Sequence, residues 1–317
     1  MKLWSSFARW GAALVAVGML WTPLARADDG RQLAASKESL YNNIYVYKEG
    51  DYYAMTFGYN RKIYTESIYN SKDDRDLPVV YTRYMTAALI YAKDVHSILE
   101  IGFGGGRTSW YLHRFLPGVS VTSVELDPDV AALAKKYFGI KDEPNFHLVN
   151  QDGRLFLQQS KDKYDIILID AYRGPFVPFH LLTKEFYQLV KDHLAPGGAV
   201  GQNVEPSTML FDSAVKTIEA VFPQTDFYVA EGNVVTVAYD GPPREAADLE
   251  KSAKQRQIEL NLRYQLPAML AQRRGLDPKT LDAGAKVLTD DFAPVEALKA
   301  IENHNRKWPD QQPSGSQ

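Results

Sequence analysis

The chain has 317 residues, of which 45% are hydrophobic and 24% are charged, close to the average for globular proteins. This composition excludes a chain that is disordered as a whole. The length allows one large domain with additions or two small domains. The formal net charge of −3 provides no basic field, so binding to nucleic acid or to an anionic membrane is not expected. Cysteine is absent, which excludes disulfides, thiolate catalysis and cysteine-bound zinc.

The first 27 residues have the pattern of a secretory signal peptide. Lys2 and Arg9 supply positive charge, residues 11–24 form an apolar run, and residues 25–27 form a small-x-small cleavage site. An uncleaved anchor is the alternative, but the apolar run is short for a membrane span and contains a proline. We therefore expect an exported protein, periplasmic or secreted, whose mature chain begins at residue 28 and has no membrane span.

Residues 28–85 predict an N-terminal β-domain with a linking helix. Aromatic and β-branched residues crowd into short runs at 44–47, 52–57 and 62–69, and turn residues separate these runs. This pattern indicates a small antiparallel sheet. At 79–93, apolar residues recur at helical spacing, so we expect a helix that leads into the core.

Residues 86–245 predict a Rossmann-like nucleoside-binding domain. Short apolar runs alternate with amphipathic segments, which is typical of a parallel sheet with helices on both faces. These runs lie at 97–101, 119–124, 146–149, 164–169 and 198–202. Two later runs, 225–229 and 234–238, are expected to form a hairpin on the same sheet. A helical segment over 246–309 and a disordered polar tail over 310–317 complete the predicted organisation.

The strongest chemical signal is a glycine-rich turn directly after the first core strand. Gly102, Gly104 and Gly106 permit positive φ and a close approach of the backbone to a ligand, and the following helix presents free N–H groups. The turn departs from G-x-G-x-x-G because its last position is Arg107, which disfavours a dinucleotide dehydrogenase. With Glu100 in front, the turn resembles the first motif of S-adenosylmethionine-dependent enzymes.

Acidic residues follow the next three strands. Glu125 ends the second strand, where a carboxylate can accept both ribose hydroxyl protons. Asp152, followed by Gly153, comes after the third strand, where related enzymes bind the adenine amino group. Asp170 closes the fourth strand, beside the expected sulfonium, where it could attract or deprotonate an amine. Any one acid alone is better explained as a helix N-cap or a solvated charge, but acids at consecutive strand ends favour ligand binding.

With these motifs the mature chain resembles the spermidine synthase family, the polyamine aminopropyltransferases. Residues 39–44, Ser-Leu-Tyr-Asn-Asn-Ile, are similar to the family's S-x-Y-Q-x-I motif, with Asn42 where Gln is usual. Residues 177–186 and 288–296 look more like the soluble half of the branch that is fused to membrane transporters. The resemblance implies an α/β, Rossmann-like S-adenosylmethionine-type transferase fold with a small N-terminal antiparallel β-domain and C-terminal helices. It also implies aminopropyl transfer from decarboxylated S-adenosylmethionine to an amine, and a homodimer. No spacing of histidines or acidic residues suggests a metal.

The chain departs from the family where polar contacts to substrate are usual. Gly105 stands where the glycine loop normally has an Asp that contacts the aminopropyl ammonium. Arg173 stands where the loop after Asp170 has a second Asp, and near Tyr81 the usual Y-H-E becomes Y-T-R. We hypothesise that Arg173 and Arg107 accommodate a carboxylate, either of intact S-adenosylmethionine or of an amino-acid-like acceptor. A solvent-facing Arg173 is the alternative.

These observations predict an aminopropyltransferase-like enzyme for a small amine or amino-acid-like acceptor. The predicted catalytic residues are Asp170, Tyr172 and Arg173. The residues predicted to bind the nucleoside co-substrate are Asn42, Tyr81, Glu100, Gly102, Gly104, Gly106, Glu125, Asp152, Gly153 and Asp170. His180 is either a further general base or a residue that packs its loop. Two alternatives stay open: a methyltransferase that uses intact S-adenosylmethionine, and a non-catalytic extracytoplasmic protein that binds a nucleoside or polyamine.

Overall fold

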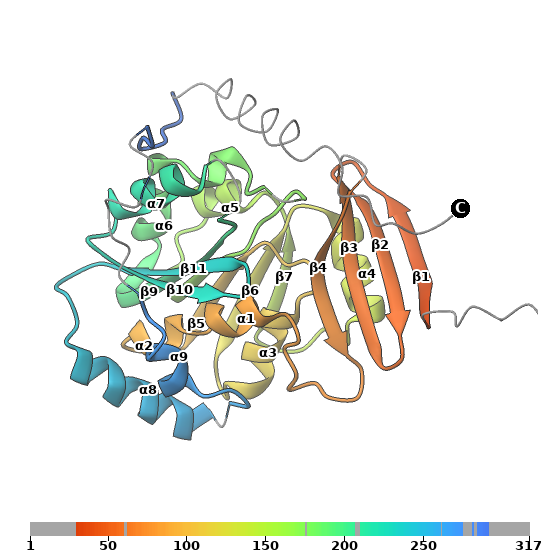
Figure 1. The fold of residues 1–317 in the computed structure, drawn as a ribbon, viewed down its shortest axis with the longest axis horizontal. Coiled ribbons are helices and arrows are strands. Elements are labelled where there is room, and N and C mark those ends of the chain that lie inside the picture. The colour runs from red at the N-terminus through yellow and green to blue at the C-terminus, as the bar shows by residue number, and fades with distance from the viewer. Residues whose placement is uncertain are drawn as a thin grey trace, which may run out of the picture. The chain divides into compact units, whose positions relative to one another are not determined.

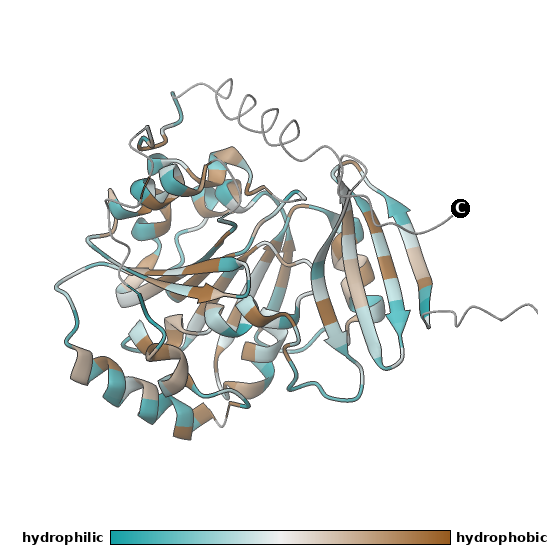
Figure 2. Cartoon of the chain, in the orientation of Figure 1, coloured by the Kyte–Doolittle hydropathy of each residue, from teal (hydrophilic) through white to brown (hydrophobic). Residues whose placement is uncertain are grey.

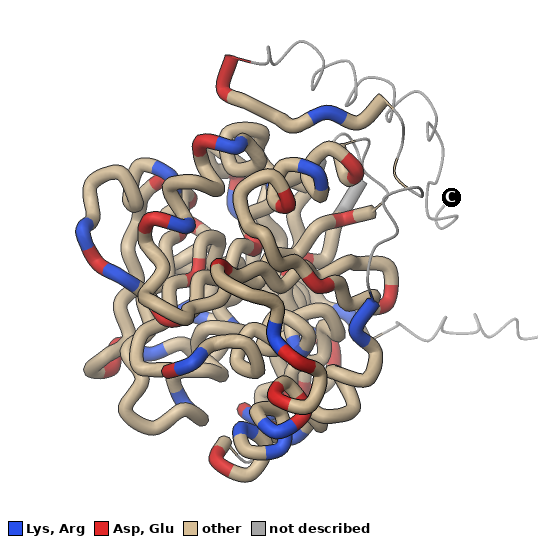
Figure 3. Tube along the Cα trace, turned by 90° about the vertical axis from the view of Figure 1, so that its left-hand side faces the viewer, with Lys and Arg blue, Asp and Glu red and all other residues tan. Residues whose placement is uncertain are grey.

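A computed structural model describes most of the chain. The described residues are 30–59, 62–174, 176–206, 210–260, 262–274, 281 and 284–291. The predicted signal peptide and polar tail, and residues 292–309 of the predicted helical segment, lie outside them. Among the described residues, no helix has the length and apolar character that crossing a membrane requires. Figure 3 shows basic and acidic residues interspersed along the chain, in keeping with the small net charge.

The N-terminal β-domain is a four-stranded antiparallel sheet in chain order (Figure 1). Its strands are β1 (Arg31–Glu38), β2 (Asn43–Glu49), β3 (Tyr52–Tyr59) and β4 (Lys62–Asn70). The three runs expected from the sequence form β2 to β4. Strand β1 was not expected, because most of its residues are exposed and it lacks the alternation of a half-buried strand. It is an edge strand that is defined by its backbone pairing with β2.

A seven-stranded sheet forms the core of the chain. Its strands are β5 (Ser97–Ile101), β6 (Ser120–Glu125), β7 (Phe146–Asn150), β8 (Tyr164–Ile169), β9 (Leu194–Val204), β10 (Gln224–Ala230) and β11 (Asn233–Tyr239). Their order is β10-β11-β9-β8-β5-β6-β7, with β5 to β9 parallel and β10–β11 an antiparallel hairpin, as predicted. The strand order reverses between β5 and β8, which is the topological switch point where α/β sheets bind ligands.

Helices cover both faces of this sheet because its strands are apolar on both sides. In β8, Ile166 and Leu168 join the hydrophobic cluster on one face, whereas Ile167 and Ile169 join the cluster on the other. Figure 2 shows hydrophobic residues concentrated on these strands. The first face carries α1 (Val80–Met85), α2 (Ala88–Tyr91), α3 (Arg107–Phe115), α4 (Pro128–Tyr137), α8 (Ala246–Leu260) and α9 (Leu266–Leu270). The second carries α5 (Gly153–Gln159), α6 (Lys184–Asp192) and α7 (Phe211–Glu219), and a short 3₁₀ turn, η1 (Phe179–Leu181), precedes α6.

Two helical predictions are corrected by the structure. The linking helix is interrupted between α1 and α2, where the Thr86 hydroxyl donates a 2.6 Å hydrogen bond to the Arg83 carbonyl. A threonine that bonds back to the preceding turn commonly bends a helix. The predicted C-terminal helical segment is helical in α8 and α9, but residues 285–289 have no regular structure. There the Leu288 N–H donates to the Thr217 hydroxyl and its carbonyl accepts from the Lys184 N–H, which holds this stretch against α6 and α7.

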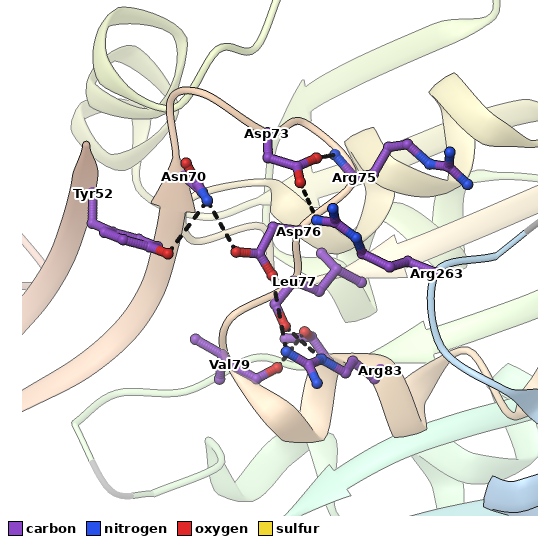
Figure 4. A network of polar contacts seen from close by, with 10 residues as sticks. Tyr52, Asn70, Asp73, Arg75, Asp76, Leu77, Val79, Arg83 and Arg263 are labelled. Atoms are coloured by element: carbon purple, nitrogen blue, oxygen red, sulfur yellow. Dashed lines mark hydrogen bonds and ion pairs between the residues drawn. The ribbon is translucent and has the colours of Figure 1, made fainter.

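The loop between β4 and α1 is held by arginines from separate parts of the chain (Figure 4). Arg83 donates from Nε to the Leu77 carbonyl at 2.7 Å and lies 3.9 Å from the Asp76 carboxylate. Arg263, which follows α8, forms an ion pair with Asp73. The arginine in the Y-T-R sequence therefore supports this loop.

The ends of β5 and β8 approach so closely that only glycine fits between them. Gly102 has φ of +91°, and a Cβ atom there would lie 2.4 Å from the Asp170 carbonyl oxygen and 2.6 Å from Ala171 Cα. Both contacts are to backbone, which cannot yield as a flexible side chain can. Glycine at this position therefore allows the switch point to close.

We expect Gly102→Ala to lower the free energy of unfolding by more than about 2 kcal/mol, because it combines left-handed backbone strain with a backbone clash. Gly118→Ala is the matched control. Gly118 has φ of +80° but no atom within 4 Å of an added Cβ, so only the strain, about 1 kcal/mol, applies. Urea denaturation of both variants measures the difference, and equal losses would contradict the close approach.

Candidate active site

A cavity of about 580 Å³ lies at the carboxyl ends of β5, β6 and β8 and extends to the N-terminal sheet. It collects nearly all the residues that the sequence predicts for the site. Those that line it are Asn42, Tyr81, Glu100, Gly102, Gly104, Glu125, Asp152, Gly153, Asp170, Tyr172 and Arg173. Gly106 does not line it. Its φ of +69° starts α3, and a Cβ there would lie 2.2 Å from the Phe103 ring, so Gly106 shapes the turn from behind.

Glu125 holds the glycine turn in place from the end of β6. Its Oε2 accepts hydrogen bonds from the N–H groups of Phe103 (3.0 Å) and Gly104 (3.2 Å), and its Oε1 accepts from Asp127 N–H (2.9 Å). Burial raises the pKa of Glu125 although these three donors favour the carboxylate. The carboxylate has further acceptor capacity for ligand hydroxyls. Asn42 lies at this end of the cavity, 3.5 Å from the Asp127 carboxylate.

Asp152 both caps a helix and lines the cavity, so the two interpretations of this acid are compatible. Its Oδ1 accepts from the Leu155 N–H at 3.0 Å, at the N-terminus of α5. Its Oδ2 lies 2.9 Å from His180 Nε2, and this hydrogen bond is the largest cause of a lowered pKa for Asp152. Gly153 lets α5 begin close to β5, because a Cβ there would lie 2.3 Å from Ile101 Cγ2.

Asp170 presents its carboxylate to the cavity between two neutral donors. Tyr81 donates from its hydroxyl to Oδ2 at 3.1 Å, and Asn203 donates from its amide to Oδ1 at 3.0 Å. Burial raises the pKa of Asp170 to about 6, and the two hydrogen bonds oppose this rise. Asp170 is therefore mostly ionised at neutral pH, yet close enough to its pKa to accept a proton.

Tyr172 and Arg173 continue from Asp170 along the cavity wall. The Tyr172 hydroxyl donates to the Asn203 carbonyl at 3.0 Å, and burial is the main cause that raises its pKa. Arg173 is exposed, and its backbone pairs with Phe176, where the Arg173 N–H donates at 2.8 Å. Its guanidinium thus belongs to the rim of the site.

Arg107 does not take the role that we hypothesised for it. Its side chain is only 3% exposed, and Nη2 lies 2.8 Å from the Asp74 carboxylate. Nη1 donates to the Phe138 carbonyl at 2.9 Å, and the guanidinium lies 4.3 Å from the centre of the Tyr69 ring. Arg107 lines the cavity, but its charge is already paired with Asp74, so it ties α3 to the loop after β4 and offers no unpaired charge to a ligand carboxylate.

The sequence did not identify the part of the cavity wall that strands β3 and β4 supply. Phe57 of β3 and Glu66 and Ser67 of β4 line the cavity, opposite the strand ends of the core. The available signal was Glu66 itself, a single acid within a run of aromatic, β-branched and small residues. Its place in the cavity depends on the packing of the two sheets, which no local pattern reports.

Glu100 lies beneath the glycine turn and is 2% exposed. Ser123 donates from its hydroxyl to Glu100 Oε2 at 3.2 Å. Burial raises the pKa of Glu100 to about 8, against hydrogen bonds from Ser109 and Ser123 that favour the carboxylate. Glu100 is therefore largely protonated at neutral pH, and it lines the cavity as a neutral acid.

The raised pKa of Glu100 predicts a loss of stability as pH rises. The unfolded chain ionises Glu100 near pH 4.5 and the folded chain only near pH 8, so ionisation favours the unfolded state between these values. The advantage of Glu100→Gln over the natural protein should therefore grow from pH 5 to pH 8, by roughly 1 kcal/mol or more. Urea denaturation at several pH values measures this difference. The exposed Glu38→Gln variant is the control, and parallel pH profiles for all three proteins would contradict the assignment.

Comparisons with known proteins agree with this geometry. The family model described as "Spermine/spermidine synthase domain" matches residues 79–234. A "Probable polyamine aminopropyl transferase" of Bifidobacterium longum is 30% identical over 84% of this chain and 62% of its own length. A "Polyamine aminopropyltransferase" of Vibrio vulnificus is 27% identical over 83% of this chain and 90% of its own length.

Among solved structures, a probable spermidine synthase from Corynebacterium glutamicum aligns with a TM-score of 0.65. It is 21% identical, over 83% of this chain and 98% of its own, so it supports the fold. The match to the family model, the two polyamine aminopropyltransferase relatives and the shared fold lead to one conclusion: the chain belongs to the spermine/spermidine synthase family.

Proposed function

We propose that this protein is an aminopropyltransferase, which moves the aminopropyl group of decarboxylated S-adenosylmethionine to an amine and releases methylthioadenosine. The observation that carries the proposal is the Asp170 carboxylate, which faces the cavity and is held between Tyr81 and Asn203. The named activities of the two bacterial relatives support the same reaction for this chain.

The residues that line the cavity suit the proposed donor. We assign Glu125 and Asp152, which line the cavity, to the ribose and adenine ends of the donor, and the glycine turn allows the backbone to approach the ligand. The cavity is also lined by the acids Glu66 and Asp170. A donor whose sulfonium and primary ammonium are both positive complements these acids, whereas the extra carboxylate of intact S-adenosylmethionine would be repelled.

The reaction asks the protein for position and for one proton acceptor. The nitrogen lone pair of the acceptor forms a bond to the carbon beside the sulfonium, and the carbon–sulfur electron pair returns to sulfur as methylthioadenosine leaves. The acceptor nitrogen gives up one proton, for which Asp170 is the proposed base. Tyr81 and Asn203 hold the Asp170 carboxylate in position for this proton transfer. The rest of the rate acceleration comes from alignment of the acceptor nitrogen with the carbon beside the sulfonium. Tyr172 and Arg173 are the proposed contacts on the acceptor side.

One observation favours a second candidate, a methyltransferase that uses intact S-adenosylmethionine. Arg173 is an exposed cation on the cavity rim, where it could pair with a carboxylate of the donor or of an amino-acid-like acceptor. The products separate the candidates, because methyl transfer yields adenosylhomocysteine and aminopropyl transfer yields methylthioadenosine.

We also propose that the protein works outside the cytoplasm, after cleavage of the N-terminal signal that residues 1–27 predict. Its partners are a small amine acceptor and, in line with the family resemblance, a second copy of the chain. Fractionation of cells with an antibody to the mature chain would test the location.

The proposed function predicts methylthioadenosine when the mature protein is incubated with decarboxylated S-adenosylmethionine and a panel of di- and polyamines. Asp170→Asn should lower the rate about 10²- to 10⁴-fold, the usual effect of losing a general base. Asp142→Asn, an exposed acid that pairs with Lys135, is the control. Chromatography of the nucleoside products measures the outcome. Release of adenosylhomocysteine from intact donor would favour the methyltransferase, and no product would remove the enzymatic proposal.

The rate should also depend on the protonation of Asp170. Because the pKa of Asp170 is about 6, the protonated form dominates below pH 6 and cannot accept the amine proton. The single-turnover rate should therefore fall about tenfold per pH unit below 6 and level off above it. A quench-flow pH series measures this profile, and a flat profile between pH 5 and 7 would exclude Asp170 as the base.

A further inference from the structure

Glu66 is placed in the cavity by an irregularity of strand β4. In the β3–β4 pairing, Met55 lies opposite Ser67 and Thr56 lies opposite Thr65, so Glu66 has no partner residue across the strands. An extra residue of this kind is a β-bulge, which bends a strand and redirects a side chain, often beside an active site. Here the redirected side chain is an acid that lines the cavity.

The Glu66 carboxylate lacks the partners that a buried acid normally has. Its Oε1 atom is buried, and no donor among the described residues forms a hydrogen bond to it. Burial and the nearby carboxylates of Asp170 and Glu125 raise the pKa of Glu66 well above its usual range. A partly buried, unpaired carboxyl beside other acids is costly to ionise unless a cation pairs with it. This arrangement indicates a site for a positively charged group.

Strand β4 packs against the glycine turn next to Glu66. Gly105 packs against the residue next to Glu66: a Cβ at position 105 would lie 2.4 Å from Ser67 Oγ and 2.8 Å from the Phe138 ring. Strand β4 thus closes the space in which a side chain on the turn would stand. The acid beside the turn is supplied by β4, and it lines the same cavity as Asp170, whose carboxylate is near enough to raise its pKa.

We propose that the Glu66 carboxylate binds the primary ammonium of the donor's aminopropyl group, and so makes the site select decarboxylated S-adenosylmethionine over methylthioadenosine. This inference rests on the proposed function, since it assigns a specificity residue within the same cavity. Glu66 is a binding residue in this scheme, and Asp170 keeps the role of base.

Titration calorimetry with two ligands tests the assignment. Decarboxylated S-adenosylmethionine carries the ammonium, and methylthioadenosine shares the nucleoside but lacks the aminopropyl group. The natural protein should bind the decarboxylated donor more tightly than methylthioadenosine. Glu66→Gln, which keeps the side-chain shape, should weaken donor binding about 100-fold and change methylthioadenosine binding less than threefold. Glu49→Gln, an exposed acid of the same sheet, should change neither affinity.

The methylthioadenosine titration also shows whether Glu66→Gln is folded, because a collapsed cavity would weaken both ligands. If both affinities fall, Glu66→Asp replaces it, and this variant must recover selectivity for the donor at least in part. The inference is overturned if Glu66→Gln retains the full preference for the donor, if the Asp variant recovers none, or if the natural protein has no such preference. None of these readouts depends on turnover. A protein that binds selectively through Glu66 but forms no product would therefore refute only the proposed function.

Discussion

The close approach of β5 and β8 at Gly102 is the constraint on which the site depends. The two strands are neighbours in the sheet although β6 and β7 separate them in the chain, so their loops must diverge from one point. A Cβ atom at position 102 would lie 2.4 Å from the Asp170 carbonyl oxygen, so only glycine fits there. The same contact sets the glycine turn beside Asp170, and so brings the proposed nucleoside-binding loop and the proposed base into one cavity.

The cavity gathers carboxylates at a cost to stability. Burial raises the pKa values of Glu66, Glu100, Glu125 and Asp170 together, so each group resists ionisation in the folded protein. Ionisable groups with shifted pKa values cluster at functional sites, where a bound ligand can pair with their charge. The proposed dicationic donor would offset the cost of ionising these acids. Part of the affinity for the donor would therefore come from relief of the unfavourable electrostatics of the empty site. Glu100 differs from Asp170 because its pKa of about 8 keeps it largely protonated at neutral pH, so it supports the turn as a neutral acid.

Much of the core could be predicted because its signals are local. Runs such as residues 164–169 are apolar on both faces, and acids that end parallel strands necessarily meet at one edge of the sheet. What the sequence did not reveal depends on distant partners. Arg107 was expected to pair with a ligand carboxylate, but Asp74, 33 residues earlier, already pairs with it. Strand β1 is defined by pairing alone, and Glu66 reaches the cavity only because β4 bulges against β3.

The absence of an acid on the glycine turn and the presence of Glu66 have one structural origin. Any side chain at position 105 would collide with Ser67, and moving Ser67 would shift the bulge that aims Glu66 at the cavity. The space beside the turn therefore admits an acid from the loop or from the strand, but not from both. In this chain the strand occupies the space. An acid missing from a sequence motif is then no sign of a missing charge, because a neighbouring element can deliver the carboxylate to the same end of the cavity.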